Sequence, residues 1–301
     1  MFKKEEILDL TEPRSVIATI LPLTVGILFS IYNFNKFSLV GTIVFAVVAV
    51  LMQTAVNTWN NIADFRRNDS KWAKNSVNNS ISEIQGSENR AWILLFVQIL
   101  VVAVGGLYLV FNSKIGLWIL ILGLLASLVG YLYSGVNFAL SWTAFGELFS
   151  GVTMGFVIFL AAVLVNIDQI SVYIVWSVAL TSIIAVTAIA NIMLANNISD
   201  AKEDLQMGRH TLVYYLGTNG SLHFFSLLYI IGYATTGLSI AFGFLPLSAA
   251  LVYLSIPFVF INVRKFYILQ SKRVTFVLSV KNALIITALL VLGMMIGILI
   301  K

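Results

Sequence analysis

The sequence is a succession of long apolar runs separated by short polar breaks. A helix needs about 20 apolar residues to cross the hydrocarbon core of a bilayer. Charged residues make up only 10% of the chain, against about 25% in soluble proteins, which excludes an ordinary water-soluble enzyme. We predict an all-α membrane protein, a single domain of residues 1–301 with nine transmembrane helices. Their ranges are 16–32, 39–62, 91–111, 115–133, 145–165, 172–199, 222–242, 247–263 and 275–300.

Basic residues indicate the orientation. Of the 18 Lys and Arg residues, all except Lys36, Lys114 and Lys301 fall on one side of the predicted bundle. Cytoplasmic loops of membrane proteins carry such an excess, so we expect an integral protein of the cell membrane with its N-terminus and these loops in the cytoplasm. Topology thus explains the basic residues, and we predict no nucleic-acid partner. We expect the basic cluster within residues 264–281 to contact anionic lipid.

A five-residue pattern, Asn-Asn-Ile-x-Asp, occurs twice, at residues 60–64 and 196–200. The copies end the second and sixth predicted helices, which places both on the cytoplasmic side. Side chains three or four positions apart share a helix face. The predicted polar stripes are Asn61, Asp64 and Asn68 at the first copy, and Asn197, Asp200 and Asp204 at the second.

Carboxylate and amide oxygens, without His or Cys, suit a hard cation such as Mg²⁺. We predict that Mg²⁺ lies between the stripes and bridges a diphosphate, because such ions keep positions for phosphate oxygens. Asn68 and Asp69 compete for one role in the first stripe. The alternative is that these acids only cap helix ends at the membrane surface. The predicted metal ligands are Asn61, Asp64, Asp69, Asn197, Asp200 and Asp204, with Asn60 and Asn68 beside them.

On these motifs the chain resembles the UbiA superfamily of intramembrane prenyltransferases, and within it the 1,4-dihydroxy-2-naphthoate polyprenyltransferases of menaquinone synthesis. Residues 196–217, NNISDAKEDLQMGRHTLVYYLG, are similar to the second Asp-rich motif of the family and the segment after it. The resemblance implies a UbiA-type bundle that holds a prenyl diphosphate through Mg²⁺. Further matches are Asn60, Asn61 and Asp64 in the first motif, Pro13-Arg14, Pro22, Gly26, and Gly146-Glu147-Leu148.

The chain departs from the family pattern at three places. Asn61 stands where relatives have an Asp, and the later acid of the first motif is displaced to Asp69 or replaced by Asn68. The stretch 133–147, YSGVNFALSWTAFGE, lacks the Pro and the Arg that relatives have before Gly-Glu. The first two departures concern the number of metal ions, and the third concerns the aromatic acceptor.

The resemblance implies a reaction in which a polyprenyl group passes from its diphosphate to 1,4-dihydroxy-2-naphthoate. Diphosphate and CO2 leave, and demethylmenaquinone results. We expect Arg67, Lys202 and Arg209 to contact phosphate oxygens, although membrane anchoring also accounts for Arg67 and Lys202. Tyr131 and Tyr133 could steady an allylic cation or serve as interfacial belt residues.

Glu147 could position or deprotonate the acceptor, or could simply be stabilised by the dipole at a helix start. Three alternatives stay open for the whole chain. One is a related transferase with 4-hydroxybenzoate, haem or a glycerophosphate as acceptor. The second is a secondary transporter, although the repeats here run in the same direction. The third is a non-catalytic scaffold, suggested by the carboxylate missing at Asn61.

Overall fold

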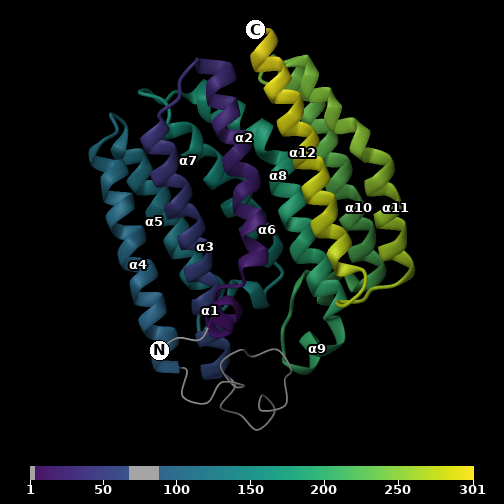
Figure 1. Cartoon of the computed structure of the whole chain (residues 1–301). Helices are drawn as coiled ribbons and strands as arrows, with labels where there is room; N and C mark the ends of the chain where they lie inside the picture. Colours follow the sequence, from purple (N-terminus) through teal and green to yellow (C-terminus); the bar gives the residue numbers. More distant parts are fainter. Residues whose placement is uncertain (1–3, 68–87) are drawn as a thin grey trace.

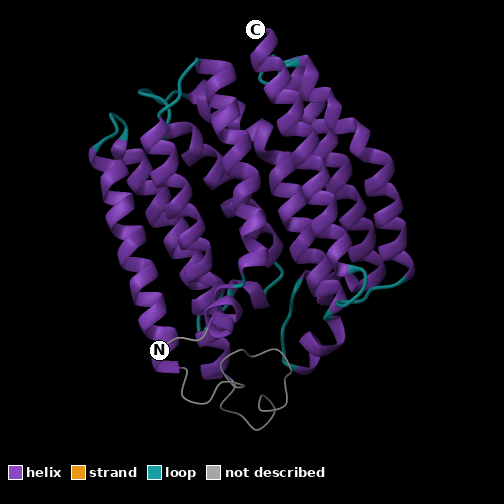
Figure 2. Ribbon diagram, in the orientation of Figure 1, coloured by secondary structure: helices purple, strands orange, loops and turns teal. Residues whose placement is uncertain are grey.

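The computed structural model describes residues 4–67 and 88–301. These residues form helices and loops, with no strand among them (Figure 2). Nine helical segments of this described part are long and apolar enough to cross a membrane, which confirms the prediction. They are α2 (Ile17–Phe34), α3 (Leu39–Arg67), α4 (Glu88–Phe111), α5 (Gly116–Tyr133), the segment Gly146–Leu164, α8 (Val172–Ser199), α10 (Leu212–Ala241), the segment Leu247–Ile268, and α12 (Phe276–Ile300).

Two of these segments are not continuous α-helices. The segment Gly146–Leu164 consists of α6 (Gly146–Gly151), a π-helix (Val152–Val157) and α7 (Ile158–Leu164). The segment Leu247–Ile268 begins as a 3₁₀ helix (Leu247–Ser255) and continues as α11 (Ile256–Ile268). Four shorter elements complete the described chain: α1 (Lys4–Thr11), the 3₁₀ turns Pro13–Val16 and Leu140–Trp142, and α9 (Ala201–Gln206).

Helix α8 is the centre of the bundle (Figure 1). Most of its side chains are buried, and it packs against α6, α10 and α12. The backbone of the π-helix comes very close to α8, because a Cβ added to Gly155 would lie 2.5 Å from the backbone nitrogen of Val186. Small residues allow this kind of close approach between membrane helices. Helices α4 and α5 instead carry many exposed apolar side chains, as expected for a surface that faces lipid.

Three predicted helix boundaries were wrong. Helix α3 continues past residue 62 to Arg67, α10 begins at Leu212 rather than at Leu222, with a kink at Gly217, and α11 continues past residue 263 to Ile268. Hydropathy marks the thickness of the bilayer, whereas a helix can extend beyond it into polar sequence. The predicted turn between the seventh and eighth spans is confirmed, because Gly243 has a φ of 75°, a left-handed conformation that favours glycine.

Candidate active site

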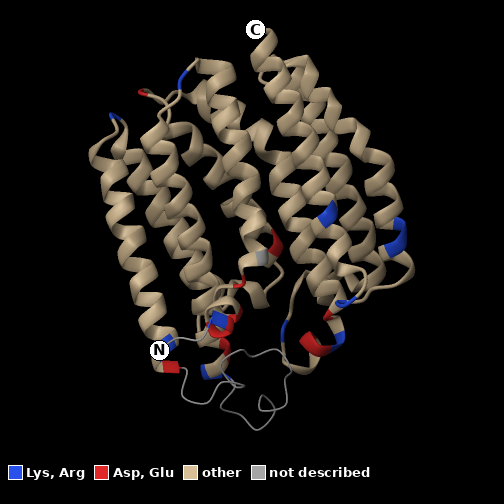
Figure 3. Cartoon of the chain, in the orientation of Figure 1, with Lys and Arg blue, Asp and Glu red and all other residues tan. Residues whose placement is uncertain are grey.

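Most ionisable side chains of the described residues lie at one end of the bundle (Figure 3). This end carries the end of α3, the end of α8, and α9. At the opposite end Asp168 pairs with Lys36 and Lys114, at N–O distances of 3.5 and 3.7 Å. Most of the described ionisable residues therefore gather at the end of the bundle where the repeated motifs lie.

The first motif lies on an unbroken helix. Asn61 and Asp64 are one turn apart on α3, and Asp64 Oδ1 accepts a hydrogen bond from Arg67 Nη1 at 2.9 Å. Asn61 is buried, and its amide nitrogen is 3.4 Å from both the Leu10 carbonyl oxygen and Glu12 Oε1. These contacts connect the first motif to the N-terminal segment.

The second motif lies on a broken helix. Helix α8 ends at Ser199, Asp200 separates it from α9, and the predicted continuous stripe is interrupted there. The backbone N–H of Asp204 still donates to the Asp200 carbonyl at 2.9 Å, so the two acids stay one turn apart.

The end of α9 folds the chain back onto the second motif. Gly208, at φ 74°, occupies the left-handed position of a Schellman motif. Its N–H donates to the Leu205 carbonyl at 3.2 Å, and the N–H of Arg209 donates to the Asp204 carbonyl at 2.9 Å. This turn brings Arg209 Nη1 within 3.2 Å of Asp204 Oδ1.

Asp204 is 3% exposed, and its Oδ2 is buried without a hydrogen-bond partner in the described structure. Burial raises the pKa of Asp204, and the neighbouring Asp200 adds to that effect, while Arg209 opposes it. A buried acceptor without a partner costs about 1–3 kcal/mol. Asp204 is therefore a carboxylate with unused capacity for a cation.

The two motifs face the same space. Asp64 of the first motif interacts electrostatically with Arg209 of the second as well as with Arg67. Glu12 interacts with Asp64 and with Lys272, a residue between α11 and α12. Lys272 Nζ donates to Asp200 Oδ2. The structure thus brings together acids and bases from four separate parts of the chain.

A second polar cluster lies beside α6. Glu147 is 2% exposed, and its Oε1 accepts a hydrogen bond from Asn197 Nδ2 at 2.8 Å. Its Oε2 is buried without a partner among the described residues, as are the hydroxyls of Tyr133 and Ser134. Glu147 interacts electrostatically with Asp204 and with Tyr133. Buried polar atoms without partners are rare in native proteins, so this cluster is suited to a polar ligand.

The structure separates the two predicted tyrosines. Tyr131 is 60% exposed and stacks on Trp59, with ring centroids 5.4 Å apart. The hydroxyl of Tyr133 is buried, and Glu147 is among the groups that act on it electrostatically. Tyr131 therefore lies at the surface, whereas Tyr133 lies in the interior.

The other predicted residues occupy varied positions. Asn60 is half-buried on α3, and Lys202 is exposed on α9. Asn68 and Asp69 lie outside the described residues. The prediction missed two residues at the site. Lys272 was expected to contact lipid as part of the basic cluster, but it pairs with Asp200. Trp142, which contacts Arg67 and Arg209, was not predicted at all. Local periodicity gives no signal for contacts between distant loops.

The donor chemistry fits Mg²⁺. The motif side chains offer only oxygen ligands, and Asp204 Oδ2 has no partner in the described structure. Within residues 4–67 and 88–301, no three His, Cys, Asp or Glu side chains approach closely enough to form a metal cluster, and each motif carboxylate is paired with a basic residue instead. Mg²⁺ binds through one or two carboxylates plus phosphate oxygens and water, so the motifs offer donors of the kind that it takes without forming a three-carboxylate cluster.

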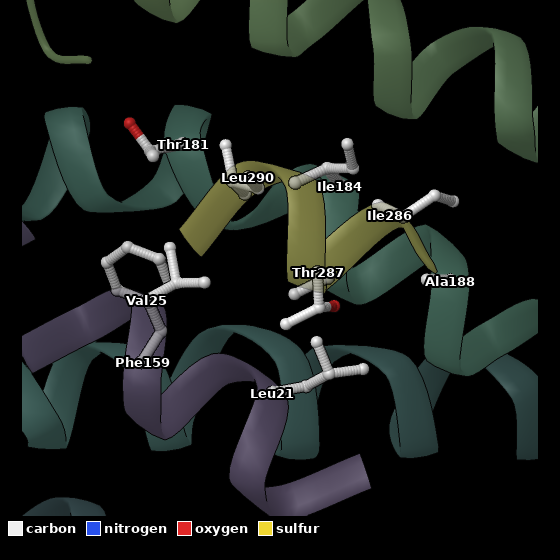
Figure 4. Close-up of a pocket in the computed structure, with 10 residues that line it drawn as sticks. Leu21, Val25, Phe159, Thr181, Ile184, Ala188, Ile286, Thr287 and Leu290 are labelled. Carbon is white, nitrogen blue, oxygen red and sulfur yellow. The ribbon is translucent and has the colours of Figure 1, made fainter. Parts of the chain in front are cut away.

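A small cavity lies in the interior of the bundle (Figure 4). Its side chains come from α2, α7, α8 and α12, and they carry no ionisable group. Leu21 and Val25 of α2 face Ile286 and Leu290 of α12 across it. The cavity is lined mainly by apolar side chains, with two threonines, so the ionisable chemistry belongs to the end of the bundle.

Comparison with known proteins identifies the family. Residues 19–277 match the model of the UbiA prenyltransferase family. The chain is 27% identical over 226 residues to the 1,4-dihydroxy-2-naphthoate octaprenyltransferase of Bacillus subtilis (strain 168), a match that covers 75% of this chain and 70% of that protein.

Solved structures show the same fold. A UbiA homolog from Aeropyrum pernix K1 matches with a TM-score of 0.72 and 18% identity, covering 98% of this chain and 100% of that one. A UbiA homolog from Archaeoglobus fulgidus, bound to GPP and Mg²⁺, matches with a TM-score of 0.67 and 17% identity, covering 97% and 99%.

Proposed function

Because the chain belongs to the UbiA prenyltransferase family, we propose that it transfers a polyprenyl group from a prenyl diphosphate to 1,4-dihydroxy-2-naphthoate, with release of diphosphate and CO2, giving demethylmenaquinone. The observation that carries this proposal is the convergence of both repeated motifs on one space, where Arg67 and Arg209 lie against the same Trp142 ring and Asp204 Oδ2 is buried without a partner among the described residues. The choice of acceptor is supported by the Bacillus subtilis relative.

Departure of the diphosphate is the first chemical problem. Asp64, Asp200 and Asp204 are the residues that would hold Mg²⁺, which when bound neutralises charge on the phosphate oxygens. Arg209 donates N–H groups to those oxygens as the C–O bond breaks and negative charge develops on the leaving group. Preorganised charge of this kind is commonly the largest contribution to catalysis.

The second problem is attack by the aromatic ring. Tyr133 is buried and interacts electrostatically with Glu147, and its ring face is the one that would stabilise the allylic cation. Asn197 holds one carboxylate oxygen of Glu147 and leaves the buried Oε2 to accept a hydrogen bond from an acceptor hydroxyl. Because Asn197 belongs to the second motif, the acceptor and the diphosphate would lie on either side of one element.

The membrane location suits these substrates, since a polyprenyl tail cannot be solvated by water. We place the motif end of the bundle on the cytoplasmic side, which the basic residues there support. A transporter with a site at the middle of the membrane is disfavoured, because most of the described acids gather at one end (Figure 3).

Product identification tests the proposal. Purified full-length chain in lipid nanodiscs is incubated with Mg²⁺, prenyl diphosphates of several lengths, and one acceptor at a time: 1,4-dihydroxy-2-naphthoate, 4-hydroxybenzoate, haem or a glycerophosphate. Mass spectrometry should detect a prenylated, decarboxylated naphthalene product only with the first acceptor. Turnover with another acceptor would replace the proposed substrate, and no transfer to any of them would refute the proposal. Asp200→Asn is the matched inactive control.

A further inference from the structure

The loop between α5 and α6 touches both motifs. At its start, Arg67 of the first motif donates hydrogen bonds to the carbonyl oxygens of residues 134–136, at 2.5, 2.5 and 3.2 Å. Farther along, the N–H of His210, next to the second motif, donates to the Trp142 carbonyl at 3.0 Å. This loop is therefore a physical link between the two halves of the site.

The side chain of Trp142 lies against an arginine from each half. The guanidinium carbon of Arg67 is 4.6 Å from the centroid of its ring, and that of Arg209 is 5.1 Å away. A guanidinium within about 6 Å of an indole ring is attracted to its electron-rich face, most strongly where water is excluded. Trp142 therefore attracts two like charges that would otherwise repel each other.

The two arginines are held to different degrees. Arg67 makes three bonds to backbone carbonyls and one to Asp64, so its donors are already engaged. Within residues 4–67 and 88–301, Arg209 has one side-chain bond, from Nη1 to Asp204, and its Nε is buried without a partner. Of the two groups over the ring, Arg209 is the one with donors to spare for an anion.

We propose that Trp142 is a positioning residue, whose indole face holds the guanidinium of Arg209 where its N–H groups meet the diphosphate of the substrate. The inference deepens the proposed function and depends on it, because it assigns the anion to that same site. Without the ring, the attractions left on Arg209 are the electrostatic one from Asp64 and the direct contact with the carboxylate of Asp204. Arg209 would then compete with the metal ion for that carboxylate and leave the phosphate.

A double-mutant cycle tests this coupling. The probe is inorganic pyrophosphate with Mg²⁺, titrated into the full chain in nanodiscs and followed by calorimetry. We expect Trp142→Leu to raise Kd about tenfold and Trp142→Phe about threefold, because phenylalanine keeps a weaker ring face. In an Arg209→Gln background, Trp142→Leu should raise Kd by less than about twofold, because coupled residues have non-additive effects.

Trp118, 46% exposed on α5, provides the control, since Trp118→Leu should leave Kd unchanged. Equal effects of Trp142→Leu with and without Arg209 would overturn the inference. If the wild-type chain transfers prenyl groups, a pyrophosphate Kd of Trp142→Leu within twofold of wild type would overturn it too. A wild-type chain that neither binds pyrophosphate nor transfers a prenyl group would overturn the proposed function as well. Circular dichroism verifies folding, and if Trp142→Leu does not fold, the same cycle is run with Trp142→Phe.

Discussion

The two copies of Asn-Asn-Ile-x-Asp end in different local structures. The first continues as helix, and its Asp64 pairs with Arg67, which is fixed by bonds to the α5–α6 loop. The second breaks at Asp200, and its acids pair with residues beyond α9, Arg209 and Lys272. The first half of the site, around Asp64, is therefore fixed by hydrogen bonds to backbone carbonyls. The second half, around Asp200 and Asp204, is held by pairs between side chains.

The difference shows that the repeat specifies which donors are present but not how firmly they are held. Rigidity comes from the residues on the C-terminal side of each copy. After the first, Arg67 reaches three backbone carbonyls. After the second, Gly208 turns the chain so that Arg209 returns to Asp204. We expect the first half to contribute mainly to stability and the second mainly to ligand binding.

Removing a carboxylate from each half should have the largest effect. Asp64→Asn and Asp204→Asn should each lower kcat/KM about 10²–10³-fold, because each removes charge from the site that stabilises the leaving diphosphate. Their stabilities should differ. Asp64→Asn leaves the mostly buried Arg67 without its carboxylate and should lower Tm by about 4–8 °C. Asp204→Asn removes a buried carboxylate whose Oδ2 has no hydrogen-bond partner among the described residues, and should leave Tm within about 2 °C of wild type.

Transfer assays and thermal unfolding in detergent measure both quantities for the two variants. Asp168→Asn, at the opposite end of the bundle, is the matched control and should retain activity. Equal losses of Tm at Asp64 and Asp204 would contradict the distinction between the two halves, and full activity in either variant would remove that residue from the site.

The two arginines should show the second largest effect. Lysine keeps the charge but cannot reproduce the planar fork of donors. Arg67→Lys should lower Tm by about 4–8 °C, because most of its carbonyl bonds are lost. Arg209→Lys should leave Tm unchanged and raise KM for the prenyl diphosphate about tenfold, because its bond to phosphate becomes a single contact.

KM and kcat from steady-state transfer, together with Tm, separate the two roles. Arg264 is exposed on α11, and Arg264→Lys is the control for an arginine-to-lysine substitution outside the site. The opposite pattern, with Arg209→Lys unstable and Arg67→Lys defective only in KM, would reverse the assignment of the rigid half.

Sequence predicted the helices and identified the oxygen donors of the motifs, because both depend on nearby residues. The nine spans follow from hydropathy, and the oxygen donors follow from the repeat itself. The partners of those donors could not be predicted. Lys272 and Trp142 reach the motifs from loops distant in sequence, and only the packing of the bundle brings them there. The break at Asp200 was also missed, since helical periodicity continues through it.

The smallest expected effect concerns Lys272, which pairs with Asp200 at a partly exposed position. Such pairs contribute about 0–1 kcal/mol to stability, so Lys272→Gln should leave Tm unchanged. The same substitution removes a positive charge that competes with Mg²⁺ for Asp200. Half-maximal activity should therefore be reached at an Mg²⁺ concentration about two- to fivefold lower than in wild type.

A magnesium titration of the transfer rate measures this shift, with Lys281→Gln, exposed on α12, as the matched control for loss of a nearby surface charge. A shift in the opposite direction would show that Lys272 contributes more to holding the anionic substrate than it costs in metal binding. Such a result would place Lys272 beside Arg209 as a phosphate-binding group. The side-chain-held half of the site would then draw its anion contacts from two loops, whereas Arg67 would remain committed to the backbone on the other half.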